Sequence, residues 1–293
     1  MTAAGQANGA SWRVVGAMRT DVGRVRSLNE DTVVFVAPAE QDPQAKLGLL
    51  ALVADGMGGH AAGEVASALA AEVVRRVYFS LDSPPAKALN TAFEAANRAI
   101  FDYAARNPEC NGMGTTCTAI AVRDQCLWLA HVGDSRAYIL RDGELTQLSE
   151  DQTLHAQLVR DGVLTAEEAE KSPGGNVILQ ALGTRQEISP DLWTEGLRLR
   201  LGDRFILCSD GLSNLASDAE ISEIVSRHSP REACAALIDA ALAAGGYDNI
   251  SVGVFAVEDA PKHSGGQAAT QRIKISDSPI GVLTAKIDTI AEG

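Results

Sequence analysis

The stretch LGLLALVADGMGGH, residues 47–60, decides the fold. Its apolar run, 47–54, has the length of one buried strand and ends abruptly at Asp55 and Gly56. A buried strand that stops at an acid delivers that acid to the edge of its sheet. The sequence therefore predicts a strand that presents Asp55 at a sheet edge.

Outward from this strand, the hydrophobic period changes twice. Apolar residues recur every four positions over 65–77, and a stripe with helical spacing covers 89–103, which predicts two helices. Residues 115–148 then alternate like strands, with tight turns at 123–125 and 142–143, and such turns join antiparallel neighbours. The pattern predicts an α+β fold in which antiparallel sheets carry layers of helices.

The predicted domain covers residues 12–258. Residues 1–11 are small and polar without periodicity, which predicts a flexible N-terminal tail, and 259–293 predict a linker and a C-terminal tail. Residues 150–176 combine a short amphipathic helix with a Pro-Gly-Gly loop. We expect this segment to be an insertion over a site.

Composition excludes several classes of protein. The 293 residues are 46% hydrophobic, which is enough for a real core, and the net charge of −13 opposes binding to nucleic acid. No apolar run approaches the ~20 residues of a membrane helix, and the start has no signal-peptide pattern, so we expect a cytoplasmic protein without membrane insertion. Five cysteines without a CxxC pair are typical of reduced, mostly buried thiols.

Four acids follow one another at the ends of apolar runs: Asp31, Asp55, Asp210 and Asp248. A single Asp-Gly usually marks no more than a turn. Because strand ends in one sheet share an edge, the recurrence predicts that these carboxylates converge. Like charges at such range are unstable without cations.

Hard divalent cations resolve this conflict. Carboxylates, carbonyl oxygens and water are the ligands of Mg²⁺ or Mn²⁺, whereas zinc calls for His or Cys ligands. Gly56 has no side chain to obstruct its carbonyl, so it offers a main-chain ligand beside Asp55. Two such ions could share a water and aim it at phosphorus or a carbonyl. The acids therefore predict a metal-dependent hydrolase.

Arg26 indicates the charge of the substrate. It lies five residues before Asp31 in the same predicted connection, and its planar guanidinium matches two phosphate oxygens. The alternative is a solvated loop arginine.

A competing motif, GMGGHA at 56–61, fits the dinucleotide fingerprint after a strand and before a helix. That unit requires a parallel strand directly after the helix. Here a second helix follows and the next strand begins only at 115, which argues against a dinucleotide site.

Eight ordered motifs resemble the protein phosphatase 2C family, the metal-dependent PPM class, and most of all its bacterial branch. They are RSLNEDTV, VADGMGGHAAGEVAS, GTTCTAIAV, AHVGDSRAYIL, LSEDQTLHAQLVRDGVLT, NVILQALG, DRFILCSDGLSN and GGYDNISV. The resemblance spans residues 12–257. It implies a four-layer α-β-β-α sandwich of two antiparallel sheets flanked by helix pairs, with a binuclear Mn²⁺/Mg²⁺ centre at one edge. It also implies dephosphorylation of phosphoserine and phosphothreonine in proteins, and it makes 150–176 the family's flap.

The resemblance implies a role for each site residue. The implied metal ligands are Asp31, Asp55, Asp210, Asp248 and the carbonyl of Gly56. Among them Asp55 would bridge both ions. Glu30 would act through a water, and Arg26 would bind the phosphate. Asp134 would help Asp210 to hold a third ion.

The general acid departs from the animal pattern. Animal members carry a histidine two residues after the bridging Asp, where this chain has Met57, as its bacterial relatives do. His60 could supply a proton to the leaving serine oxygen, although a histidine satisfied by the helix start is an equal alternative.

The expected partners are phosphorylated proteins, including a Ser/Thr kinase or its targets, and the expected state is a monomer. Two other functions stay open. One is a phosphoprotein-binding regulator that has kept the fold and lost turnover, and the other is a hydrolase of small phosphate esters.

Overall fold

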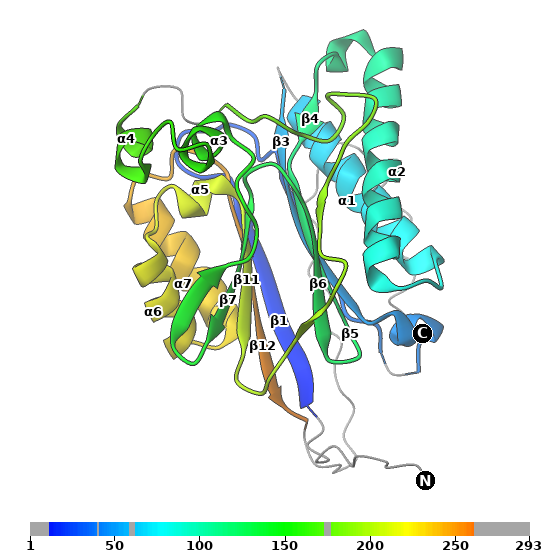
Figure 1. The fold of residues 1–293 in the computed structure, drawn as a ribbon, viewed down its shortest axis with the longest axis vertical. Helices are drawn as coiled ribbons and strands as arrows, with labels where there is room; N and C mark the ends of the chain where they lie inside the picture. The colour runs from blue at the N-terminus through cyan, green and yellow to red at the C-terminus, as the bar shows by residue number, and fades with distance from the viewer. Residues whose placement is uncertain (1–11, 40, 59–61, 173–176, 261–293) are drawn as a thin grey trace.

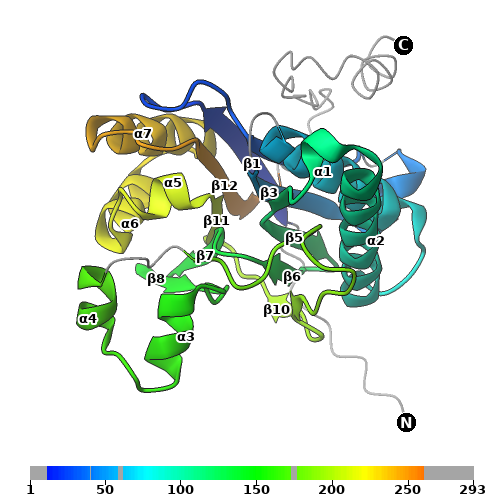
Figure 2. The ribbon, with the colours of Figure 1, turned by 90° about the horizontal axis from the view of Figure 1, so that it is seen from above.

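The structure is a computed structural model that describes residues 12–39, 41–58, 62–172 and 177–260. Two antiparallel sheets lie face to face, and helices cover the outer face of each sheet (Figure 1, Figure 2). This arrangement confirms the predicted α+β sandwich of four layers. The tails 1–11 and 261–293 lie outside the described residues, and the last strand ends at Asp259, one position beyond the predicted domain boundary.

The first sheet contains the strand predicted from the apolar run 47–54. Its order is β10-β6-β5-β3-β2, with β4 added to β3 and β9 added to β6. The bounds are β2 Asp31–Val36, β3 Leu49–Met57, β4 Gly114–Thr115, β5 Cys117–Arg123, β6 Cys126–Val132, β9 Asp191–Leu192 and β10 Leu197–Arg198. Helices α1 (Ala62–Ser80) and α2 (Pro85–Arg106) cover its outer face.

The second sheet joins both ends of the described chain. Its order is β1-β12-β11-β7-β8, and its strands are β1 Trp12–Asp21, β7 Arg136–Arg141, β8 Glu144–Gln147, β11 Arg204–Cys208 and β12 Ile250–Asp259. Trp12 pairs with Asp259 at one end of this sheet, and Asp21 pairs with Ile250 at the other. The helices on this side are α5 Asp210–Ser213, α6 Asp218–Arg227 and α7 Pro230–Ala243.

Three apolar cores separate the four layers. One lies between the first sheet and α1 with α2, and one lies between the second sheet and α6 with α7. The third fills the space between the sheets, where the rings of Phe205 and Phe255 stack with centroids 5.0 Å apart. Because β3 contributes side chains to two of these cores, its apolar run is continuous rather than alternating.

Tight turns connect the meandering strands, as the sequence predicts. Asp124 and Gln125 between β5 and β6 have φ of 48° and 65°, and Asp142 and Gly143 between β7 and β8 have φ of 54° and 86°. Two consecutive positive φ values match the twist of an antiparallel hairpin. Two 3-10 helices, Pro43–Leu47 and Pro108–Cys110, complete the connections.

The flap contains two short helices, α3 (Leu154–Arg160) and α4 (Ala166–Lys171). Thr165 and Glu168 form a capping box at the start of α4. At the base of the flap, Arg136 of β7 makes a bidentate ion pair with Asp151, the shortest distance being 2.7 Å. The predicted Pro-Gly-Gly loop at 173–175 falls outside the described residues.

All five cysteines are free, and four of them are buried. Among the described residues, no helix is both long and apolar enough to cross a membrane.

Candidate metal centre

Asp31 and Asp55 face each other across β2 and β3, at the start of one strand and near the end of the other. Opposite residues of an antiparallel pair have Cβ atoms about 5 Å apart. Local bonds satisfy the main chain of Asp55: its N–H donates to Thr116 Oγ1 at 3.0 Å, and its carbonyl accepts from the N–H of Thr116 at 2.8 Å and from Thr115 Oγ1 at 2.8 Å. The carboxylate of Asp55 is therefore not needed to hold the strand.

Three more acids lie beside strands of the second sheet, so the expectation that the converging acids share the edge of one sheet is wrong. Asp210 follows β11 as the first residue of α5, Asp248 precedes β12, and Asp134 precedes β7. The two sheets are joined here, because Ser209 Oγ donates to Asp31 Oδ2 at 2.8 Å. The sandwich thus brings strand ends from both sheets to one place.

Burial and mutual repulsion show that these acids form one group. Burial raises the pKa of Asp55 well above its ordinary value, and repulsion from Asp31, Asp210, Asp134 and Asp248 raises it further. Burial is also the main cause that raises the pKa values of Asp31 and Asp210, and it raises that of Asp134 to about 7. We call these five carboxylates the acidic cluster.

The acidic cluster fits a hard cation. One oxygen each of Glu30, Asp31, Asp134 and Asp210 is buried without a hydrogen-bond partner among the described residues. All of these groups are oxygen donors, which Mg²⁺ and Mn²⁺ prefer. Among the described residues, no group of three or more Asp, Glu, His or Cys side chains is arranged so that these side chains alone could hold a metal ion. An ion here would therefore take part of its shell from water and main-chain carbonyls, as Mg²⁺ commonly does.

Gly56 and Glu30 lie in close contact beside the cluster. A Cβ on Gly56 would stand 2.1 Å from the carbonyl oxygen of Gly63, and a Cβ on Gly63 would stand 2.4 Å from Glu30 Oε1. The N–H of Gly56 donates to the carbonyl of Glu30 at 3.1 Å. Burial raises the pKa of Glu30, while the charge of Arg26 opposes this shift. Only glycines allow the start of α1 to approach this closely.

Arg26 lies on the exposed side of the cluster. Its Nη2 donates to Asp248 Oδ2 at 2.8 Å, and about half of the Arg26 side chain is exposed. This hydrogen bond is the main cause that raises the pKa of Arg26, and the charges of Glu30 and Asp55 raise it as well. The guanidinium therefore stands where an anion approaching the acidic cluster would meet it.

Asn249 is a site residue that the sequence analysis missed. Its Nδ2 donates to the carbonyls of Val22 and Leu28, both at 2.9 Å, and its Oδ1 accepts from the N–H of Glu30 at 2.8 Å. This buried amide thereby fixes the loop that carries Arg26 to the strand that follows Asp248. The only signal in the sequence was an Asn directly after a candidate ligand.

Buried hydroxyls beneath the cluster were also missed. Thr116 Oγ1, which accepts from Asp55, lies 2.7 Å from Ser135 Oγ, the residue after Asp134. Both side chains are fully buried. They connect a strand of the first sheet to the turn that carries Asp134, so the spacing between two candidate ligands depends on them.

His131 is buried in β6, as its strand context predicts. Its Nε2 lies 3.0 Å from the carbonyl of Glu150, and its Nδ1 lies 2.8 Å from Thr118 Oγ1. Because a carbonyl only accepts, Nε2 carries the proton. The imidazole thus connects the base of the flap to the first sheet.

Replacing His131 should change how stability depends on pH. Burial lowers the pKa of His131, so below the ordinary value of about 6.5 the unfolded chain takes up a proton that the folded chain refuses. The free energy of unfolding of the wild type therefore loses a contribution as pH falls. In His131→Gln this loss is absent. As pH falls from 7.5 to 5.5, the free energy of unfolding should therefore decrease less in the variant than in the wild type. Urea unfolding at both pH values measures it.

His155→Gln on α3 is the matched control, because His155 is only partly buried. It should follow the wild-type pH dependence. Parallel curves for His131→Gln and wild type would contradict the prediction.

The residue proposed to donate a proton, His60, lies outside the described residues. Met57, which stands at the position of the animal histidine, is the last residue of β3. The described part of the first sheet therefore places a thioether, not an imidazole, two positions after Asp55.

Comparison with known proteins gives consistent matches. A family model described as protein phosphatase 2C matches residues 24–243. The serine/threonine protein phosphatase PstP of Mycobacterium tuberculosis is 44% identical over 246 residues, which cover 83% of this chain and 45% of that protein. The serine/threonine phosphatase stp of Listeria innocua is 35% identical over 240 residues, which cover 80% of this chain and 92% of that protein.

A solved structure agrees with both sequence matches. The catalytic domain of PstP in complex with two manganese ions matches with a TM-score of 0.73 and 41% identity, covering 85% of this chain and all of that one. The chain spans less than half of the full length of its M. tuberculosis relative.

Proposed function

The chain belongs to the protein phosphatase 2C family, and we propose that it hydrolyses phosphoserine and phosphothreonine in proteins. The observation that carries the proposal is the acidic cluster, in which buried and half-buried carboxylates from two sheets lie together with Arg26 on their exposed side. The alternative of a regulator without turnover gains no support, because every candidate acid is present.

We assign the metal ligands to the chain as follows. Asp55, whose pKa is raised by all four other acids of the acidic cluster, would hold Mn²⁺ or Mg²⁺ together with Asp31, Asp210, Asp248 and the carbonyl of Gly56. Glu30 contributes through a water. Asp134 and Asp210 form a place for a third ion. The paired ions would supply a water of lowered pKa and neutralise charge on the phosphate.

The chain itself binds and orients the phosphate. The guanidinium of Arg26 donates to two phosphate oxygens, which fixes phosphorus over the acidic cluster. Asn249 keeps the Arg26 loop at a set distance from Asp248 through its three hydrogen bonds. The orientation of the phosphate thus depends on a buried amide that does not touch it.

The leaving oxygen needs a proton. Water attacks phosphorus, the bond from phosphorus to the serine or threonine oxygen breaks, and that oxygen is released as a hydroxyl. We assign the proton donor to His60, directly or through water, since Met57 cannot donate one.

We further propose that the enzyme is a cytoplasmic monomer whose substrates include a Ser/Thr kinase or its targets. The relatives named above are serine/threonine phosphatases of bacteria. Removal of a phosphate from serine or threonine reverses the step that a Ser/Thr kinase catalyses, which supports this proposal. The hydrolysis of small phosphate esters would be a by-product of the same site.

Removing the metal should abolish activity. We expect hydrolysis of para-nitrophenyl phosphate to stop when EDTA is added and to return with excess Mn²⁺ or Mg²⁺, because the proposed nucleophile is a water whose pKa the ions lower. A phosphothreonine peptide should behave in the same way. Colorimetric release of nitrophenol and of inorganic phosphate measures both reactions. Hydrolysis that continues in EDTA would refute the proposed chemistry.

A further inference from the structure

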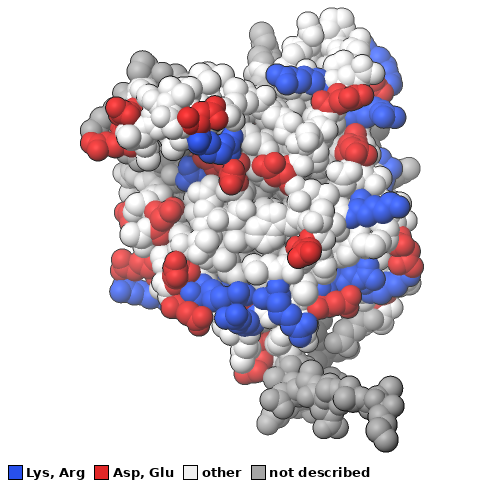
Figure 3. Space-filling model, viewed as in Figure 1, with Lys and Arg blue, Asp and Glu red and all other residues white. Residues whose placement is uncertain are grey.

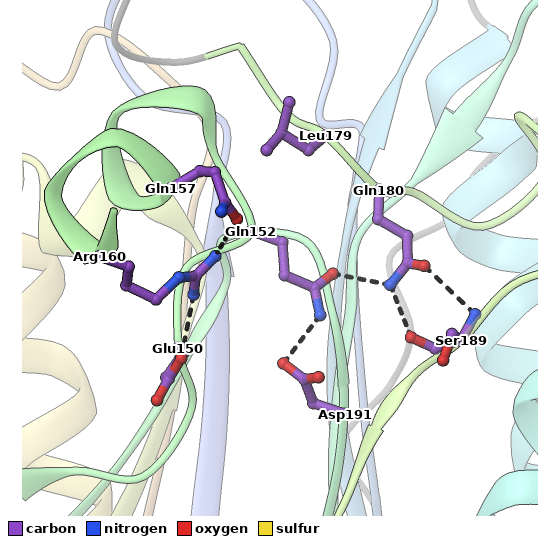
Figure 4. A pocket seen from close by; sticks show the side chains of 8 residues that line it. All are labelled: Glu150, Gln152, Gln157, Arg160, Leu179, Gln180, Ser189 and Asp191. Carbon is purple, nitrogen blue, oxygen red and sulfur yellow. Dashed lines mark hydrogen bonds and ion pairs between the residues drawn. The ribbon is translucent and has the colours of Figure 1, made fainter. Parts of the chain in front are cut away.

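A hollow of about 400 Å³ lies between α3 of the flap and the segment 179–191 (Figure 4). Its lining is mostly polar and includes Gln152, Arg160, Gln180 and Asp191. We call it the flap pocket. None of the residues assigned to metal or phosphate above lines it.

The flap pocket is adjacent to the acidic cluster. Gln152, on its wall, accepts from the N–H of Gly133 at 2.9 Å, and Asp134 is the next residue. On the other side, the segment that carries Gln180 continues to Leu182, whose carbonyl accepts from the N–H of Thr115 at 3.1 Å. A polypeptide with a phosphorylated residue at the cluster would therefore pass close to this pocket.

The amide groups of the pocket are used within its own wall. Gln180 Nε2 donates to Gln152 Oε1 at 3.1 Å and to the carbonyl of Ser189 at 2.9 Å, and Gln152 Nε2 donates to Asp191 Oδ2 at 2.9 Å (Figure 4). Among the described residues, no hydrogen bond reaches the second oxygen of the exposed Asp191. The wall therefore offers an acceptor at Asp191, while the side-chain amides of Gln152 and Gln180 donate within the wall.

The charged groups of the pocket favour a cation. Arg160, its one lining guanidinium, donates to Glu150 at 3.0 Å and to Gln157 at 3.0 Å, so its charge is already paired. Asp191 remains as the uncompensated charge. In the view of Figure 1, several Lys and Arg side chains lie along the lower edge of the molecule and others along its right-hand side (Figure 3).

We propose that the flap pocket receives a lysine or arginine side chain of the phosphoprotein substrate, a few residues from the phosphorylated serine or threonine. This inference rests on the proposed function and adds a preference to it. A basic side chain would place its stem along Leu179 and its charged end at Asp191. Charge pairing at such a partly exposed site is worth about a fivefold change in affinity.

Asp191→Asn tests the pocket, because it removes the charge and keeps an oxygen for Gln152. The substrates are phosphothreonine peptides of one length. Each peptide carries one Lys, placed at one of the positions from three before to three after the phosphothreonine, and a matching peptide carries Gln at that position. For the wild type, we expect KM to be about fivefold lower with Lys than with Gln at one or more of these positions. Asp191→Asn should lose this preference. Glu150→Gln, which frees Arg160, should also weaken it.

The controls are Asp142→Asn and Glu144→Gln in the hairpin of β7 and β8, each of which also removes one negative charge. Both should keep the preference for Lys over Gln. All variants should hydrolyse para-nitrophenyl phosphate equally well with Mn²⁺, because this ester does not reach the pocket. Absence of a Lys preference in the wild type, or its persistence in Asp191→Asn, would overturn the inference.

The outcomes separate the two proposals. If no form hydrolyses para-nitrophenyl phosphate with Mn²⁺, the proposed function fails. Fluorescence anisotropy of labelled peptides then tests the pocket inference. It compares the affinity for the Lys peptides with that for the Gln peptides, in the wild type and in Asp191→Asn. If the ester is hydrolysed and no Lys preference exists, only the pocket inference fails.

Discussion

Asp55→Asn is expected to lower kcat for para-nitrophenyl phosphate by about a thousandfold or more. Metal ions contribute several kcal/mol to the stabilisation of such transition states, and about 4 kcal/mol corresponds to a factor of about 10³. The variant keeps the shape of the side chain and removes the central negative charge of the acidic cluster. Steady-state kinetics at saturating Mn²⁺ measures the loss.

A second measurement separates lost metal binding from misfolding. Burial and repulsion raise the pKa of Asp55, which means that they destabilise its charged form. A neutral amide at this position should therefore not lower the free energy of unfolding of the metal-free protein, and the unfolding temperature of the metal-free variant should not fall. The rise in unfolding temperature that Mn²⁺ causes in the wild type should shrink. Asp102→Asn on α2, whose partner is Arg106 at 3.6 Å, is the control and should behave as wild type. Normal kcat and a normal Mn²⁺ response in Asp55→Asn would remove Asp55 from the site.

Arg26→Ala is expected to lower kcat/KM for phosphate esters roughly 10- to 100-fold. A hydrogen bond to a charged group is worth about 1.5–3 kcal/mol, and Arg26 is assigned a bidentate contact. Arg26→Lys should fall between wild type and Arg26→Ala, because it keeps the charge and loses the planar fork. Inhibition by inorganic phosphate should weaken in the same order.

Arg24→Ala is the matched control from the same loop. Arg24 donates to the carbonyl of Leu242 at 2.9 Å, away from the acidic cluster, so its loss should leave phosphate inhibition unchanged. The Mn²⁺-induced rise in unfolding temperature should survive in Arg26→Ala, which separates the loss of phosphate binding from disturbance of Asp248. Equal phosphate inhibition in Arg26→Ala and wild type would contradict the assigned role.

Much of the fold could be predicted from local patterns. The run 47–54 predicted β3 because a strand covered on both faces needs apolar side chains at every position. Helical spacing predicted α1 and α2, and short turns predicted antiparallel neighbours. Asp31 and Asp55 were both expected at a strand terminus, and the register of β2 with β3 places them opposite each other.

The contacts that adjust the site could not be predicted in this way. Asn249 binds main-chain groups more than 200 positions earlier in the chain, and Ser209 reaches Asp31 across the two sheets. Such bonds depend on how the sheets pack, which no hydrophobic period encodes. The flap pocket is similar, since its wall combines Gln152 with Gln180 and Asp191 from an irregular segment.

The pairing of Trp12 with Asp259 brings the start of the first strand next to the end of the last strand. This pairing and the acidic cluster lie at opposite ends of β1, which has ten residues and is about 33 Å long. Joining position 12 to position 259 and opening the chain at the hairpin turn of Asp124 would preserve the strand pairings of both sheets. A circular permutant of this kind should keep the proposed activity, because the acidic cluster is built from residues that are neighbours in space and does not depend on where the chain starts.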